Sequence, residues 1–156
     1  MNCPLAGVTI QTLSRMTDER GWLVELFRQD ELPEAVLPRM CYLSVTKPGV
    51  TRGPHEHREQ SDLFVFLGPG QFRLYLWDNR PRSGTFGGRW SGEFGETAGA
   101  RVVVPCGIVH AYRNISAVDG LVYNAPNRLY RGTGKQGPVD EIRHEDSPDS
   151  PYQIED

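Results

Sequence analysis

The chain has no hydrophobic run that approaches the length needed to cross a membrane. Its N-terminal segment also lacks the basic residues and the following apolar stretch of a secretory signal peptide. Tracts of lysine and arginine are missing too, since the net charge is −3 and charges of both signs are interspersed. We therefore expect neither a membrane nor a nucleic-acid polymer among the partners of this protein.

Cysteine is scarce in this sequence. The three cysteines, Cys3, Cys41 and Cys106, are odd in number, and no two of them have the CxxC spacing. This pattern argues against a disulfide framework and against a zinc knuckle. Thiols that stay reduced favour a cytoplasmic location.

Glycine and proline are frequent, with 17 and 12 positions among 156 residues, which favours short strands and turns over long helices. Apolar runs, continuous or alternating, predict strands at 21–27, 40–46, 63–67, 71–77, 101–104 and 121–123. One short N-terminal helix is predicted around residues 30–36, with Pro33 in its first turn. The sequence thus predicts one all-β domain over residues 1–156, with a core at about 18–130 and a polar C-terminal extension at 131–156.

Three of the four histidines lie in two short segments that favour a common site. His55 and His57 are two residues apart, so in a strand both point to one face while Glu56 points away. His110 follows a predicted tight turn at residues 105–107. A histidine taken alone is more often a surface residue or a satisfied core residue. Three imidazoles brought together in a barrel can bind a divalent metal or act as acid and base near neutral pH.

These two segments resemble the paired signature motifs of the cupin superfamily. The first motif corresponds to Gly49, His55, His57 and Asp62, and the second to Gly99, Pro105, Gly107, His110 and Asn114. The resemblance implies a cupin fold, which is a double-stranded β-helix or jelly-roll barrel. Cupins carry out many reactions, so the motifs indicate the fold and the place of the site rather than the chemistry.

A second resemblance is to the dTDP-4-dehydrorhamnose 3,5-epimerases, an RmlC-like branch of the cupins. It rests on segments in the same order and spacing: DERGW at 18–22 with Glu25 after it, RGPH at 52–55, DNRPRSGTFGGRW at 78–90, PCGIVHAY at 105–112, and a strand tyrosine at Tyr123. The match covers most of residues 18–130. It implies an isomerase that acts on a 4-keto-6-deoxy sugar nucleotide and needs no cofactor.

The epimerase resemblance also implies roles for individual side chains. His55 would be the base that takes a proton from a carbon beside the ketone, and Tyr123 the acid that returns a proton to the opposite face. We also assign His110 to the catalytic group, together with Asp62, which occupies the position of a family catalytic residue. The substrate-binding residues would be Arg20, Glu25, Arg52 and His57, with the arginines on the diphosphate or the ring oxygens. Without the resemblance, the arginines fit surface ion pairs equally well, and Tyr123 fits a core position.

Three positions depart from the epimerase pattern and keep other reactions open. The family lysine that stabilises the enolate is replaced by Asp62, whose charge would repel an enolate, and two family polar residues are replaced by Met40 and Tyr42. The chain also carries a general cupin metal set, formed by His55, His57, Asp62 and His110. A divalent metal bound there could stabilise an enolate or support other chemistry. The HxH segment after Arg52-Gly53 also resembles the sugar-nucleotide 3,4-ketoisomerases. The alternatives are therefore a metal-dependent cupin enzyme, such a ketoisomerase, and a non-catalytic sugar-nucleotide binder.

The resemblance further implies a homodimer, because epimerases of this type exchange N-terminal strands and complete each pocket from the partner. Arg20 would then serve the neighbouring site. The segment 21–27 would be an edge strand that needs covering, which points to the same arrangement.

Overall fold

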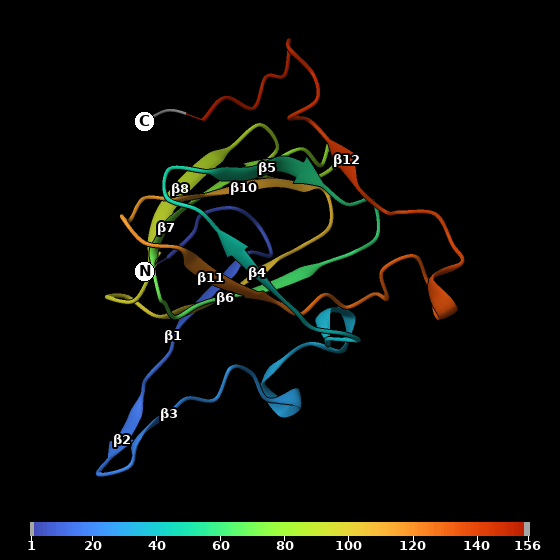
Figure 1. Cartoon of the computed structure of the whole chain (residues 1–156). Coiled ribbons are helices and arrows are strands. Elements are labelled where there is room, and N and C mark those ends of the chain that lie inside the picture. Colours follow the sequence, from blue (N-terminus) through green and yellow to red (C-terminus); the bar gives the residue numbers. More distant parts are fainter. Residues whose placement is uncertain (1, 155–156) are drawn as a thin grey trace.

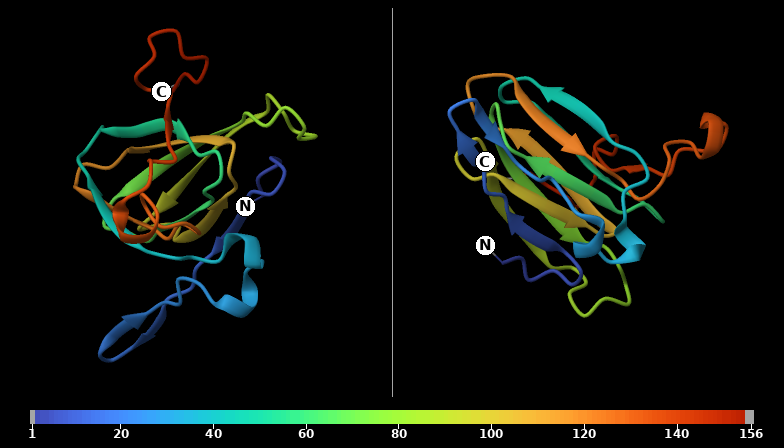
Figure 2. Two further views of the ribbon diagram at one scale, coloured as in Figure 1. Left: turned by 90° about the vertical axis from the view of Figure 1, so that its right-hand side faces the viewer. Right: turned by 90° about the horizontal axis from the view of Figure 1, so that it is seen from below.

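The computed structural model describes residues 2–154, in which two five-stranded sheets face each other around a common core (Figures 1 and 2). The first sheet has the strand order β1–β9–β6–β11–β4, and the second has the order β12–β5–β10–β7–β8. Neighbouring strands in both sheets pair antiparallel. The first sheet comprises β1 (Thr9–Thr12), β4 (Tyr42–Thr46), β6 (Asp62–Phe66), β9 (Ala100–Val104) and β11 (Gly120–Asn124). The second comprises β5 (Thr51–Glu56), β7 (Gln71–Asp78), β8 (Arg89–Gly95), β10 (Ile108–Asn114) and β12 (Ile142–Arg143).

The main core fills the space between the two sheets. Alternate residues of each strand point inward, as Phe64 and Phe66 do on β6 and Leu74 on β7. The intervening residues of β6, Leu63 and Val65, point outward and form a second cluster under the N-terminal segment. The continuous apolar run at 63–67 therefore belongs to a strand that is buried on both faces, as the sequence predicted.

The predicted helix at 30–36 is wrong in its form. The structure has two 3₁₀ turns instead, η1 (Gln29–Glu31) and η2 (Glu34–Val36). Leu32 between them is extended, with φ −112° and ψ 138°. The physical reason is Pro33, because a proline disfavours the helical conformation of the residue before it.

The predicted strand at 21–27 is shorter than expected. Only β3 (Gly21–Leu23) is paired, with β2 (Met16–Asp18), and this hairpin projects away from the barrel (Figure 1). Val24 and Leu26 pack instead on the outer cluster of the first sheet. Four further strands had no prediction. They are β1 and β2 in the N-terminal segment, β8, which is rich in glycine and exposed positions, and β12, which lies in the polar extension.

The C-terminal extension returns to the barrel. After η3 (Thr133–Lys135) the chain adds β12 to the edge of β5 (Figure 1). In this pairing Arg143 lies opposite His55. Tyr152 packs its ring on Trp77 and on His144, which covers the outer face of the second sheet. Within residues 2–154, no helix combines the length and apolar character required to traverse a lipid bilayer.

Candidate active site

The structure brings the three motif histidines together at the end of the barrel where β5 finishes. His55 on β5 lies directly opposite His110 on β10, and their ring centroids are 4.4 Å apart with the edge of one ring toward the other. His57 follows β5, and its ring centroid lies 5.7 Å from each of the other two. Each of the three rings has one nitrogen that lies within 4.8 Å of a nitrogen of each of the other two.

A short turn fixes this convergence. Gly107 has a φ of 74°, which the left-handed region permits most readily for glycine, and its N–H donates to the His57 carbonyl. A Cβ at this position would lie 2.6 Å from the Arg80 side chain. The turn before β10 is therefore tied to the loop after β5, which holds His57 beside His110.

Backbone carbonyls set the orientation of two imidazoles. The Nδ1–H of His110 donates to the Ile108 carbonyl at 3.0 Å, and the Nδ1–H of His57 donates to the Asp140 carbonyl. Because a carbonyl oxygen only accepts, both rings must carry their proton on Nδ1. The Nε2 of His110 is buried and has no hydrogen-bond partner among the described residues. The Nδ1 of His55 is likewise buried and unpartnered there.

Asp62, at the start of β6, lies beneath the histidines and is almost fully buried. Its Oδ2 lies 3.1 Å from Nε2 of His57 and 3.5 Å from Nε2 of His110. Its Oδ1 accepts hydrogen bonds from the amides of Gln60 and Asn124, both at 2.9 Å. Both oxygens of the carboxylate thus have polar partners, the histidines at Oδ2 and the two amides at Oδ1.

The charges of the cluster follow from this geometry. Burial alone would raise the pKa of Asp62, but the hydrogen bond from His57 and the nearby His110 lower it to about 2. Burial also opposes the charge of His57, yet the Asp62 carboxylate raises the pKa of His57 to about 9. At neutral pH these two residues therefore form an imidazolium–carboxylate pair.

The other two histidines are neutral. Burial, followed by the neighbouring imidazoles of His110 and His57, lowers the pKa of His55 to about 2. Burial also lowers the pKa of His110. The cluster thus holds one cationic and two uncharged imidazoles at neutral pH.

The first sheet supplies the opposite wall of this site. Tyr42 begins β4 and lies across from Asn124 on β11, whose amide N–H donates to the Tyr42 hydroxyl at 2.8 Å. Deeper in the barrel, the hydroxyl groups of Ser44 and Tyr112 are 3.1 Å apart. Asn124 therefore links Tyr42 to Asp62, and through Asp62 to the histidines.

Two acidic residues of the C-terminal extension reach the site, and the sequence reasoning missed both. The Asp140 carboxylate accepts the backbone N–H groups of residues 58, 59 and 60, each at 2.9 Å, while its carbonyl holds His57. An oxygen of Glu141 lies 3.9 Å from Nε2 of His55. No local motif marks either residue, because more than eighty positions separate them from the histidines they contact.

Tyr123 does not join this group, which corrects its expected place in the site. It alternates with Val122, which lies in the main core, and therefore points to the outer face of the first sheet. There it packs against the outer cluster that contains Leu63 and Val65.

Three predicted substrate contacts also lie away from the cluster. Arg20 sits on the projecting hairpin with its side chain 85% exposed and paired with Asp18. Glu25 is exposed and lies 3.5 Å from Arg28. Arg52 is exposed and donates to the Thr46 hydroxyl and to the Val45 carbonyl on β4, so it makes no contact with the histidine cluster in these bonds.

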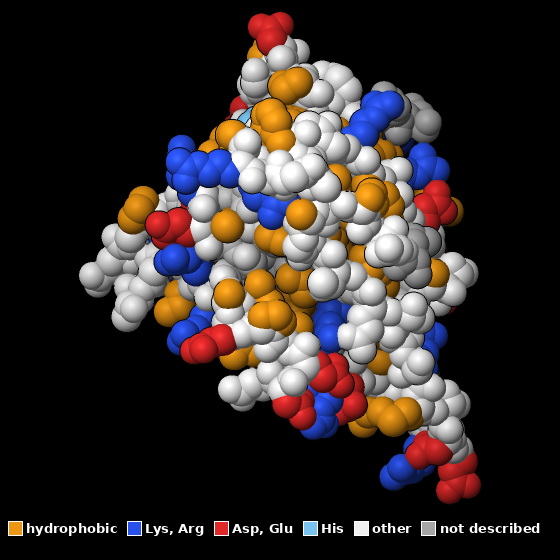
Figure 3. Space-filling view, turned by 180° about the vertical axis from the view of Figure 1, so that it is seen from behind, with side chains coloured by type: hydrophobic (Ala, Val, Ile, Leu, Met, Phe, Trp, Pro, Cys, Tyr) orange, Lys and Arg blue, Asp and Glu red, His pale blue; other side chains and the backbone are white. Residues whose placement is uncertain are grey.

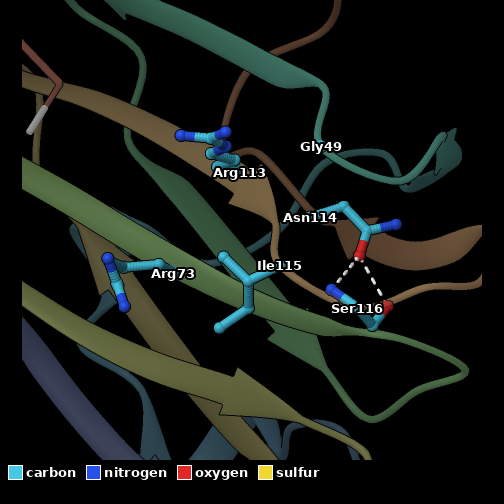
Figure 4. Close-up of a pocket in the computed structure, with 6 residues that line it drawn as sticks. All are labelled: Gly49, Arg73, Arg113, Asn114, Ile115 and Ser116. Atoms are coloured by element: carbon cyan, nitrogen blue, oxygen red, sulfur yellow. Dashed lines mark hydrogen bonds between the residues drawn. The ribbon is translucent and has the colours of Figure 1, made fainter. Parts of the chain in front are cut away.

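A separate depression of about 270 Å³ lies at the far end of β10 (Figure 4). Arg73 and Arg113, which are cross-strand partners, line it together with Ile115. The Asn114 side-chain oxygen accepts hydrogen bonds from the N–H and the hydroxyl of Ser116 at its edge. The depression contains none of the clustered histidines, so it is distinct from the candidate site.

The model of the dTDP-4-dehydrorhamnose 3,5-epimerase family matches residues 2–143. The chain belongs to this family. A probable low-salt glycan biosynthesis epimerase, Agl13 of Haloferax volcanii, is 35% identical over 124 residues, which are 79% of each chain. Membership confirms the predicted RmlC-like family and the class of enzyme, a sugar-nucleotide epimerase.

Solved structures confirm the cupin-like jelly-roll fold. A dTDP sugar isomerase from Desulfovibrio desulfuricans superposes with a TM-score of 0.83 at 21% identity, covering 98% of this chain and 94% of that one. ChmJ, a 3′-monoepimerase from Streptomyces bikiniensis solved with dTDP-quinovose, has a TM-score of 0.76 at 21% identity, covering 99% and 81%. At these identities the likeness establishes the fold alone.

Proposed function

We propose that this epimerase acts on a 4-keto-6-deoxy sugar carried on dTDP, and that His55 is the base. The observation that carries the proposal is the convergence of His55 with His57, His110 and Asp62 at the barrel mouth of a family member. ChmJ, with the same fold, binds a dTDP sugar, which supports this class of substrate. The ketone makes the neighbouring C–H acidic enough for an imidazole to remove its proton.

The surroundings of His55 favour proton transfer only when a substrate reacts. In the resting site the pKa of His55 is low, so the ring is uncharged and ready to accept a proton. An enolate that forms beside it brings a negative charge, and Glu141 lies 3.9 Å away. Both charges favour the imidazolium form. Because the enolate charge develops only during the reaction, it raises the proton affinity of His55 as the reaction proceeds.

The Asp62 side chain does not act as an isolated negative charge at this site. Its carboxylate is paired with the His57 imidazolium, so the pair carries no net charge. A developing enolate therefore meets a neutral pair in place of the family lysine. The pairing therefore removes the repulsion that an isolated Asp62 charge would exert on the enolate.

A solvent-exchange experiment tests the proposal. The protein is incubated in heavy water with a dTDP-4-keto-6-deoxy sugar, and deuterium at carbons 3 and 5 is followed by NMR. We expect incorporation by the wild type and its loss in His55→Ala. His144→Ala is the matched control, because His144 lies on the outer face and pairs with Glu56. A wild type that exchanges no hydrogen with any such sugar would overturn the function.

A metal-dependent reaction is a second candidate, and the histidine cluster favours it. The three imidazoles offer nitrogens within 4.8 Å of one another, and carbonyls orient His57 and His110 as they do metal-bound histidines. Asp62 would supply a carboxylate oxygen. A bound divalent ion would polarise the sugar ketone. Elemental analysis of the purified protein shows whether it holds a metal, and deuterium exchange is then measured on metal-free protein with and without added Mn, Fe, Ni or Zn. Exchange that is unchanged in the metal-free protein refutes this second candidate.

The projecting hairpin supports a homodimer. Trp22 and Leu23 are exposed on it, and Leu43 and Val45 are exposed on the outer face of β4. From behind, the hairpin extends from the lower right of the molecule with charged side chains at its tip (Figure 3). Exchanged hairpins would cover these apolar surfaces and carry Arg20 and Glu25 toward the partner's site. A monomeric mass in light scattering would contradict this arrangement.

We also propose a cytoplasmic location. Cys3, Cys41 and Cys106 are all free thiols, as a reducing compartment allows. Nucleotide sugars are the substrates expected there.

A further inference from the structure

The acid of the reaction has to be found on the wall of the barrel opposite His55. Inversion at a carbon requires that the proton leaves from one face of the sugar ring and returns to the other. His55 lies on β5 of the second sheet, and the first sheet provides the facing wall. Tyr123, also on the first sheet, points out of the barrel and cannot reach a substrate in this pocket.

Few side chains on the facing wall carry a proton that could be transferred. Asp62 acts as an acceptor, because its Oδ1 takes hydrogen bonds from Gln60 and Asn124 and its Oδ2 lies 3.1 Å from Nε2 of His57. Asn124 offers only amide protons, which are not acidic. Ser44 and Thr46 carry aliphatic hydroxyl groups, which are far weaker acids than a phenol. The phenol on this wall is that of Tyr42.

The Tyr42 side chain faces the site rather than the outer surface. It lies directly opposite Asn124, and residues opposite each other in an antiparallel pair share one face of the sheet. The Asn124 amide donates to the Tyr42 hydroxyl and to Asp62, which contacts His57 and His110. We propose that Tyr42 is the acid that returns the proton, a role that rests on the proposed epimerase function.

The hydrogen bonding of Tyr42 suits this role. Asn124 donates to the phenolic oxygen, so the Tyr42 proton is not used in that bond, and within residues 2–154 no acceptor takes it. Tyr42 is 45% exposed, which leaves its hydroxyl accessible from the barrel mouth. Loss of surrounding water and the charge of Asp62 raise the pKa of Tyr42 to about 12, so the phenol stays protonated at physiological pH. Asn124 would stabilise the phenolate that remains after transfer.

The proton balance of the step is complete. His55 takes a proton from the carbon beside the ketone, and the electron pair of that C–H bond moves into the enolate. The enolate carbon then takes the Tyr42 proton on its other face, and the ketone is restored. His55 is left as imidazolium and Tyr42 as phenolate, and exchange with water returns both to their starting states.

Tyr42→Phe separates the acid from the base. With His55 intact, the variant still forms the enolate, and the imidazolium can return deuterium from heavy water only to the face it left. We expect deuterium incorporation with retained configuration, while inversion falls by roughly 10²- to 10⁴-fold. Thermal unfolding and dTDP binding, both measured on the purified variant, show that the fold and the pocket are preserved.

The outcomes distinguish this role from the proposed function. A Tyr42→Phe variant that inverts at the wild-type rate overturns the assignment of Tyr42. Loss of inversion in Tyr123→Phe, with Tyr42→Phe unaffected, overturns it in favour of the outer tyrosine. A wild-type protein without any exchange overturns the epimerase function itself, and the role of Tyr42 with it.

Discussion

Replacing His57 by glutamine removes the positive partner of Asp62. The buried carboxylate then keeps hydrogen bonds from Gln60 and Asn124 but loses the only charge that compensates its own among the described contacts. Breaking a buried pair by removing one partner costs about 3–5 kcal/mol. For a chain of this size, 1 kcal/mol corresponds to about 2–4 °C in Tm, so we expect Tm to fall by about 6–20 °C.

The same pair predicts how stability depends on pH. The pKa of His57 rises from 6.5 to about 9 on folding, so the folded protein holds its proton more tightly than the unfolded chain. The resulting stabilisation is fully present below the unfolded pKa of 6.5 and is lost as the pH rises through the folded pKa of about 9. The full shift corresponds to about 3 kcal/mol. His57→Gln lacks this titration and should lose little stability between these two values.

Urea denaturation between about pH 6 and about pH 10 measures both effects. Asp62→Asn in the His57→Gln background provides the matched control, because it replaces the unpaired charge with an amide. We expect the double variant to regain most of the lost stability. Equal pH slopes for wild type and His57→Gln, with less than about 0.5 kcal/mol between them, would refute the charge assignment.

Two further predictions concern backbone contacts, one beside the candidate site and one beside Ser116 at the opposite end of the barrel. Asp140→Ala removes the acceptor of three backbone N–H groups, so we expect the free energy of unfolding to fall by about 1–2 kcal/mol in urea denaturation. The control is Asp146→Ala at an exposed position, which should lose less than about 0.5 kcal/mol. Equal losses in the two variants would contradict this role of Asp140. Gly70 has a φ of 88°, and a Cβ at this position would lie 2.6 Å from Cα of Gly120. Gly49 is the matched control, because its φ of 73° is similar but its Cβ would meet nothing within 4 Å. We expect Gly70→Ala to lose about 1–3 kcal/mol more free energy of unfolding than Gly49→Ala. Equal Tm values for these two glycine variants would show that the close approach is relieved without cost.

Local spacing in the sequence was sufficient to predict the histidine site. His55 and His57 are two residues apart, so their side chains share a face. The turn at residues 105–107 leads directly into the neighbouring strand, which carries His110 opposite His55. The alternating and continuous apolar runs predicted the core strands β6, β7, β9 and β11 for the same reason, since side-chain direction in a strand is set by neighbours along the chain. They did not predict β8, whose Phe94 also lies in the core. The family motifs then indicated the class of reaction.

The contacts that complete the site depend on tertiary structure. Asp140 and Glu141 lie in a polar extension that looks like surface in the sequence, and only the return of β12 to β5 brings them to His57 and His55. The register of β11 decides that Tyr123 faces outward, because a shift of one residue would reverse every side chain on that strand.

The sequence by itself therefore determined the barrel, the family and the three histidines. The tertiary structure decided their charges, because the pKa values of His57 and Asp62 depend on burial and on partners that are distant in the chain. It also decided that Tyr42, and not Tyr123, lies on the inner face of the first sheet. Strand register and the path of the C-terminal extension control these features, and neither leaves a local signal in the residues concerned.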